Sequence, residues 1–148
     1  MRTDTPQPVR LDAYAPPPFR VDDAALDIAL DPDHTIVRSR LKMRREGAGD
    51  APLTLDGEAL ELLSVRLDGR LLDPIGYRVN DTSLEIDDLP DAFTLEIETA
   101  FSPRANTALS GVYLSNDRIF SQCEAEGFRR ITYFLDRPDV LARYAVRI

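Results

Sequence analysis

Hydrophobic and polar side chains alternate along much of this chain, which is the pattern of half-buried β-strands. Leu26, Ile28 and Leu30 are separated by small or acidic residues, and Asp31-Pro32 predicts a type I turn after them. The next run has Val37, Ser39, Leu41 and Met43 on one face, and Arg38, Arg40, Lys42 and Arg44 on the other. These features predict a hairpin with a polar outer face.

Shorter alternating runs follow, each ended by turn residues. They cover 53–55, 63–67, 77–79, 84–86 and 93–99. In the most regular run, 93–99, Glu96 and Glu98 lie on the polar face, and we expect them to pair with the cationic side chains of 38–44 across neighbouring strands. Short strands at this spacing predict an all-β fold, either an antiparallel β-sandwich or a saddle of curved sheets.

The two ends of the chain differ from this pattern. The proline-rich start predicts an extended or disordered lead-in over 1–13, followed by one β domain over 14–148. Asp136 and Asp139 predict the start of one short helix near the C-terminus, because carboxylates are favoured at helix amino ends. A new alternating run begins at Tyr144 and is still under way at Ile148. We therefore expect the chain to be a segment of a longer protein.

Length and charge limit the class of protein. The 148 residues suffice for one core, and the formal net charge of −8 disfavours binding to nucleic acid. No apolar run approaches the roughly 20 residues that span a bilayer, and the amino terminus lacks the apolar stretch of a signal peptide. The single cysteine fits a reducing compartment. We expect no membrane association and a cytoplasmic location.

Few residues are candidates for chemistry. One histidine, His34, and one cysteine, Cys123, cannot supply the roughly three protein ligands of a catalytic zinc or a nucleophile with its base. We expect His34 to be an exposed turn residue and Cys123 a buried packing residue. Glu124 and Glu126 are two residues apart, so in an extended segment both would point to one side. From composition alone they are surface residues.

The C-terminal third carries a resemblance to a known family. Residues 107–113, 122–129 and 131–144 closely resemble the end of the amino-terminal domain in the bacterial aminopeptidase N family. The members of that family are zinc-dependent gluzincin aminopeptidases. The middle segment reads Gln122, Cys123, Glu124, Ala125, Glu126, Gly127, Phe128 and Arg129. Weaker similarity covers 14–30 and 53–67. The resemblance implies a saddle-like, largely antiparallel β domain that packs on a thermolysin-like zinc catalytic domain.

The resemblance also implies what this segment lacks and what it contributes. The family's zinc ligands come from a His-Glu-x-x-His helix and a distant glutamate, and the chain contains no such motif. It implies a parent zinc metallo-aminopeptidase of broad specificity, with the zinc held outside this chain, which by itself should be inactive. Glu124 is then expected to hold the free α-amine of peptide substrates, and Gln122 to line the pocket for the first side chain. An apolar surface near Tyr113, Phe120 and Phe128 should meet the downstream catalytic domain.

Two alternatives remain open at this point. The regular alternation over 26–99 is also compatible with a stand-alone β-sandwich interaction module that has no catalytic role. A relative of the family with altered or lost catalysis is a further possibility. A His-Glu-x-x-His motif in the downstream reading frame would distinguish the peptidase from the module.

Overall fold

A computed structural model describes residues 10–47 and 49–148 of the chain. Its strands are β1 (Phe19–Ala29), β2 (Thr35–Arg45), β3 (Leu53–Asp56), β4 (Glu61–Leu67), β5 (Arg70–Leu71), β6 (Arg78–Val79), β7 (Ser83–Ile86), β8 (Ala92–Phe101), β9 (Gly111–Ser115), β10 (Arg118–Gln122) and β11 (Arg143–Arg147). The helical elements of the described part are short 3₁₀ turns, η1 (Leu11–Ala13), η2 (Pro74–Gly76) and η3 (Phe128–Arg130). The predicted all-β fold is confirmed.

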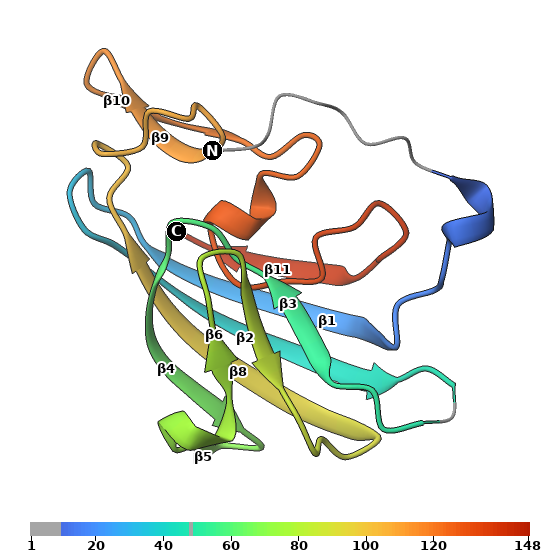
Figure 1. Ribbon diagram of the computed structural model, residues 1–148. Helices are drawn as coiled ribbons and strands as arrows, with labels where there is room; N and C mark the ends of the chain where they lie inside the picture. The colour runs from blue at the N-terminus through green and yellow to red at the C-terminus, as the bar shows by residue number, and fades with distance from the viewer. Residues whose placement is uncertain (1–9, 48) are drawn as a thin grey trace.

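The strands form three sheets. The large sheet has the order β11-β1-β2-β8-β4-β5, a smaller one has the order β3-β7-β6, and β9 pairs with β10. Figure 1 shows β1, β2 and β8 as a long curved band, with the β3-β7-β6 sheet in front of it and the β9-β10 hairpin above. The pairs are antiparallel except that β11 runs parallel to β1. The saddle of antiparallel sheets is therefore as expected, apart from this edge pair.

The predicted hairpin of β1 and β2 is present, and the chain bends at 32–33 between the two strands. The Asp31 carboxylate accepts hydrogen bonds from the backbone N–H groups of Asp33 and His34, at 2.8 and 2.9 Å. His34 is exposed, as predicted. Leu30 differs from the expectation, because it lies beyond the end of β1 and is 42% exposed. The strand also starts earlier than the alternation suggested, at Phe19, and its register shifts at a bulge between Val21 and Asp23.

The charged outer face of the large sheet is arranged as the alternation predicted. Along β2 the apolar face is buried and the cationic face is exposed. Arg38 lies opposite Glu98 on β8 and Arg40 lies opposite Glu96. The ion pairs measure 2.8 Å from Arg38 Nη2 to Glu98 Oε1 and 3.6 Å from Arg40 Nε to Glu96 Oε1. The cationic stripe is thus partnered within the domain.

The main core lies between the large sheet and the β3-β7-β6 sheet. It includes Phe19, Leu41 and Leu95 from the large sheet and Leu55 and Leu84 from the smaller one, all fully buried. A second cluster, which we call the hairpin cluster, packs below β9 and β10. Its buried members are Leu26, Val37, Val112 and Ile131. Residues 131–135 contribute to both clusters and so join the C-terminal segment to the sheets.

Buried hydroxyls strengthen that join. Thr132 Oγ1 donates to Ser39 Oγ at 3.1 Å, and Thr99 Oγ1 donates to the carbonyl of Ile131 at 3.3 Å. Ser39 in turn donates to the carbonyl of Ile97. A buried hydroxyl is costly without a partner, and each of these has one. The contact with Thr132 therefore explains why the polar Ser39 lies on the apolar face of β2.

The short helix predicted to start at Asp136 is absent. Residues 136–142 form a turn and irregular chain, and Leu141 is 86% exposed. The Asp136 carboxylate does not cap a helix that starts at Asp136; it accepts hydrogen bonds from the backbone N–H and Nε of Arg129 in η3 instead. Residues 1–9 of the predicted lead-in lie outside the described residues, and the remainder includes η1. No helix within the described ranges is long and apolar enough to span a membrane.

Candidate functional site

The candidate site follows the β9-β10 hairpin. Gln122 is the last residue of β10 and pairs with Gly111, the first residue of β9. The chain then turns over residues 124–127 and enters η3. Gln122 and Glu124 are both exposed. The Glu124–Ala125 peptide bond is cis. Glu124 and Glu126 would share one side only in an extended segment, and that condition is not met, because the backbone turns at these residues.

Gly127 closes this turn tightly. Its N–H donates to the carbonyl of Cys123 at 2.8 Å. A β-carbon on Gly127 would lie 2.6 Å from the carbonyl oxygen of Gln122 and 2.8 Å from Cys123 Cα, which is too close for any other residue without movement of the backbone. The turn that carries Glu124 therefore packs directly on the residue that precedes η3.

Cys123 is half-buried and packs against the hairpin cluster. Burial raises the pKa of its thiol, and the nearby charge of Asp136 adds to the effect. Because the thiolate is the nucleophilic form, a raised pKa makes the thiol less reactive near neutral pH. The environment fits the packing role that we expected from the sequence.

An ionic group lies on the other side of the turn, and we call it the Arg129 cluster. It consists of Asp56, Glu58, Glu126, Arg129 and Asp136. Arg129 Nε donates to Asp136 Oδ2 at 2.9 Å, and the guanidinium is 3.8 to 4.0 Å from oxygens of Asp56, Glu58 and Glu126. The side chains of Arg129 and Asp136 are only 16% and 11% exposed. This pair was not anticipated from the sequence.

Burial and charge act in opposite directions in the Arg129 cluster. Burial by itself would lower the pKa of Arg129, but the hydrogen bond to Asp136 and the surrounding carboxylates raise it overall. Burial raises the pKa of Asp56, although the charge of Arg129 opposes the rise. Arg129 therefore stays cationic and compensates several carboxylates at once.

Glu124 differs from Glu126 in its contacts. Within the described residues, no hydrogen bond or ion pair involves the Glu124 carboxylate, whereas Glu126 approaches Arg129. An exposed carboxylate of this kind can receive a cation from outside the chain through charge-assisted hydrogen bonds. The amide of Gln122, two residues earlier and also exposed, can donate and accept hydrogen bonds beside it.

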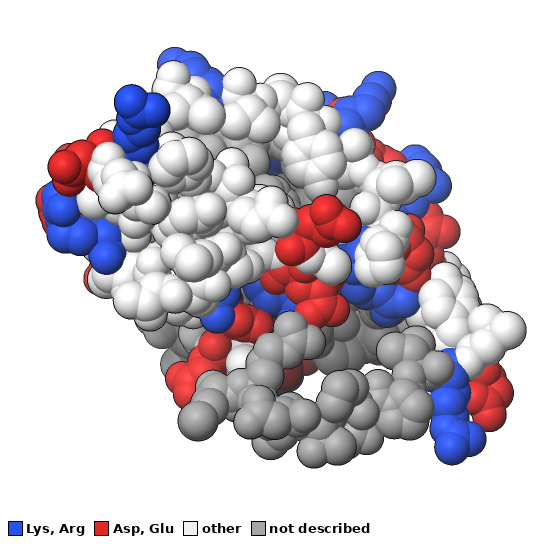
Figure 2. All heavy atoms as spheres, turned by 90° about the horizontal axis from the view of Figure 1, so that it is seen from above, with Lys and Arg blue, Asp and Glu red and all other residues white. Residues whose placement is uncertain are grey.

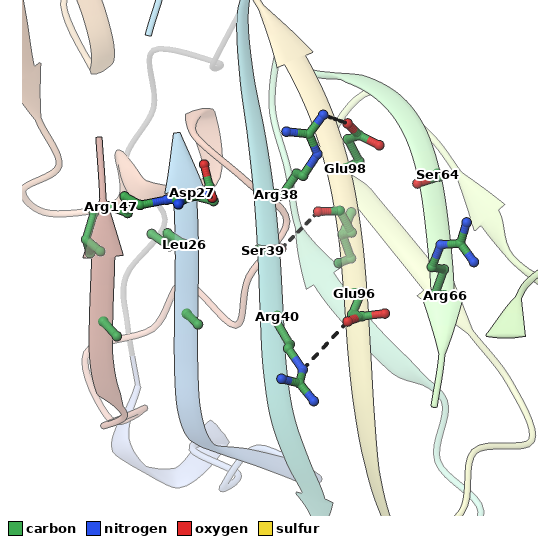
Figure 3. A pocket seen from close by; sticks show the side chains of 14 residues that line it. Leu26, Asp27, Arg38, Ser39, Arg40, Ser64, Arg66, Glu96, Glu98 and Arg147 are labelled. Atoms are coloured by element: carbon green, nitrogen blue, oxygen red, sulfur yellow. Dashed lines mark hydrogen bonds and ion pairs between the residues drawn. The ribbon is translucent and has the colours of Figure 1, made fainter. Parts of the chain in front are cut away.

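A separate hollow of about 610 Å³ lies on the outer face of the large sheet. Figure 3 shows its charged side chains paired across the strands, Arg38 with Glu98, Arg40 with Glu96, and Arg147 with Asp27. Neither Gln122 nor Glu124 lines it. Because most of its charges are already partnered, we assign it no ligand.

Exposed apolar side chains occur in the C-terminal third of the chain. They are Leu109, Phe120, Leu141, Tyr144, Val146 and Ile148. Tyr113 stacks on Phe120 and is itself half-buried, as is Phe128. Figure 2 views the molecule from the side of the β9-β10 hairpin and shows a broad area of uncharged side chains, bordered by charged ones. Of the three aromatic residues around which an apolar surface was predicted, Phe120 is exposed, whereas Tyr113 and Phe128 are half-buried, so a continuous apolar surface at the hairpin stays a prediction.

The described residues do not fit a metal site. In residues 10–47 and 49–148, no three side chains of histidine, cysteine, aspartate or glutamate are grouped so that they could hold a metal ion. His34 and Cys123 lie at the β1-β2 turn and under the hairpin, respectively. We therefore derive no step in this chain that passes through zinc.

Comparison with known proteins places these features in a family. The family model described as Peptidase M1 N-terminal domain matches residues 34–148. Aminopeptidase N of Caulobacter vibrioides is 51% identical over the whole chain, and aminopeptidase N of Escherichia coli is 45% identical over 99% of it. The chain covers 17% of the length of each relative.

A solved structure agrees with the sequence comparison. The crystal structure of Legionella pneumophila aminopeptidase A in complex with aspartic acid matches with a TM-score of 0.82 and 30% identity. The match covers 93% of this chain and 17% of the Legionella chain. The shared fold, the whole-length identity and the family match agree with one another, and this chain belongs to the Peptidase M1 N-terminal domain family.

Proposed function

We propose that this domain serves a zinc-dependent aminopeptidase of broad specificity, in which it binds the free α-amine of the peptide substrate and packs on the catalytic domain. The observation that carries the proposal is the exposed Glu124 carboxylate beside Gln122, at the base of the β9-β10 hairpin, in a chain of this family. Glu124 is assigned to the amine and Gln122 to the pocket for the first side chain.

The chemistry of an exopeptidase supports these assignments. Such an enzyme must distinguish the charged amino end of a peptide from an internal residue. A carboxylate that accepts hydrogen bonds from an ammonium group gives bonds about twice as strong as neutral ones. When the amine is held at one end of the substrate, the scissile bond lies at a fixed distance from it. The binding energy of the amine then serves to position the scissile bond. The Legionella relative was solved with aspartic acid, which carries an α-amine.

The zinc and its ligands are assigned to the part of the parent protein outside this chain, where the metal would polarise the scissile carbonyl and activate water. We propose that the chain by itself does not hydrolyse peptides, and that Leu109, Phe120 and Leu141 belong to the surface that meets the catalytic domain. Both points rest on the family resemblance and on the exposure of these apolar side chains. A cytoplasmic location remains a prediction, favoured by the single cysteine.

The test is Glu124→Gln in the whole protein that carries this chain. The amide keeps the size of the side chain but loses its charge, so we expect kcat/KM for peptides with a free α-amine to fall by about tenfold or more. Glu61→Gln is the matched control, because Glu61 is also an exposed glutamate but begins β4. An unchanged kcat/KM in Glu124→Gln would remove the role that we assign to this residue.

A further inference from the structure

We propose that Arg129 is a positioning residue for substrate recognition: together with Asp136 it holds the turn that carries Glu124. This inference rests on the proposed function, because it assigns to Arg129 a role that acts through the amine-binding carboxylate. Arg129 itself does not touch the substrate in this proposal.

Arg129 is attached to Asp136 and, through it, to the end of β3. Its backbone N–H and its Nε both donate to Asp136 Oδ2, at 3.1 and 2.9 Å, and its Nη2 donates to the carbonyl of Asp136 at 3.0 Å. The N–H of Asp136 donates to Asp56 Oδ2 at the end of β3, at 3.1 Å. The carbonyl of Arg129 accepts the N–H of Glu58 at 2.9 Å. Backbone and side chain of Arg129 are thus both tied to the segment after β3.

The 3₁₀ helix η3 directly contacts the turn over residues 124–127. Gly127 lies two residues before Arg129, and its N–H is hydrogen-bonded to Cys123. The backbone of Gly127 is so close to Gln122 and Cys123 that no β-carbon would fit. Glu124 lies between Cys123 and Gly127, so both flanks of its backbone are held by groups whose position follows that of η3. A shift of η3 would move the Glu124 carboxylate with it.

Arg130, the neighbouring arginine, differs from Arg129 in its contacts. Arg130 is also half-buried, and its Nη2 donates to Glu58 Oε2 at 2.9 Å. Among the described residues its side chain makes no hydrogen bond to Asp136. Substitution of Arg130 therefore removes a comparable charge and ion pair from the same element, η3. It leaves the link from Asp56 through Asp136 to Arg129 intact. It serves as the matched control.

The experiment is a double-mutant cycle in the whole protein, with a peptide that has a free α-amine as substrate. We compare Arg129→Gln, Glu124→Gln and the double variant by kcat and KM. If Arg129 acts through Glu124, Arg129→Gln lowers kcat/KM by about three- to tenfold, and the double variant is no worse than Glu124→Gln alone. A tenfold change corresponds to about 1.4 kcal/mol. Arg130→Gln is expected to stay within about twofold of the unmodified protein.

Several outcomes would overturn the inference. Arg129→Gln with unchanged kinetics, or two effects that multiply in the double variant, would show that Arg129 does not act through Glu124 even though Glu124 keeps its role. No effect of Glu124→Gln would overturn the proposed function, and an Arg129→Gln effect in that case would mark a purely structural residue. If Arg129→Gln does not fold, as judged by circular dichroism, Asp136→Asn takes its place in the cycle, because asparagine keeps an oxygen for the Arg129 donors.

Discussion

The ring of Tyr133 packs on the backbone of Gly57 so closely that a β-carbon at Gly57 would lie 2.2 Å from Tyr133 Cε1. Tyr133 is 2% exposed, and the adjacent Phe134 forms a β-bridge with Asp56. This joint attaches the C-terminal segment to the end of β3. It thereby brings Asp56 and Glu58 within reach of Arg129, next to the turn that carries Glu124.

The first prediction concerns this joint. Gly57→Ala is expected to lower the free energy of unfolding by about 2 kcal/mol, because the added methyl group would overlap the ring of Tyr133, which is buried. Urea unfolding, followed by circular dichroism, measures the change. Gly76→Ala is the control, since no atom lies within 4 Å of a β-carbon at Gly76. Equal stability of the two variants would contradict the close packing of Tyr133 on Gly57.

The second prediction separates the two faces of β2. Leu41 is fully buried, and Leu41→Ala should cost about 3 kcal/mol of stability through lost contacts and the cavity left behind. Arg38 is 60% exposed in its side chain, so Arg38→Gln should cost no more than about 0.5 kcal/mol despite its 2.8 Å pair with Glu98. Denaturant midpoints of the two variants test this order. A larger loss for Arg38→Gln would mean that the outer ion pairs matter more than their exposure indicates.

The third prediction is a pH dependence caused by Asp56. Its pKa is raised from the ordinary 3.8, first because of burial and further through Asp136 and Glu126, with Arg129 and the N–H of Asp136 opposing the rise. The folded chain therefore keeps this proton to higher pH than the unfolded chain. The contribution of Asp56 to stability is greatest below pH 3.8 and is lost as the pH rises through the folded pKa.

Asp56→Asn tests that sign. Asparagine cannot ionise but keeps an oxygen for the N–H of Asp136, so the variant should lack this decline in stability above pH 3.8. The measurement is the difference between the unfolding free energies of the two proteins from pH 3.5 to 7. Asp33→Asn is a control for which the opposite pH dependence is expected, because the guanidinium of Arg104 lowers the pKa of Asp33. A difference curve for Asp56→Asn that rises in favour of the unmodified protein with increasing pH would contradict the prediction.

Much of the fold could be predicted because the side-chain period of a strand is two residues. The alternation in 37–44 and 93–99 identified the buried and exposed faces of β2 and β8, and the charges on them indicated that Glu96 and Glu98 would pair with the cationic side chains of 38–44. Turn chemistry at Asp31 located the hairpin. The alternation, the complementary charges and the turn residues are each visible in short stretches of sequence. They can therefore be recognised before the topology is known.

The candidate site was less predictable. The segment around Gln122 and Glu124 was found by family resemblance, and the alternation of the chain predicted no particular backbone for it. Nothing in the local pattern indicates that Gly127 packs on Gln122, or that Asp136 receives Arg129 instead of capping a helix. An aspartate that is followed closely by a proline, as Asp136 is by Pro138, can either cap a helix or begin a turn, and the local sequence looks the same for both.

The sequence by itself determined which side chains of β2 and β8 are buried, because burial alternates with residue number there and requires no knowledge of the partner. It also identified the family through a long segment of specific residues. Only the tertiary structure decided the place of β11 beside β1, the use of Asp136 by Arg129, and the joint of Gly57 with Tyr133. These contacts join residues far apart in the chain, and their energies depend on burial and close packing that exist only when the sheets have come together.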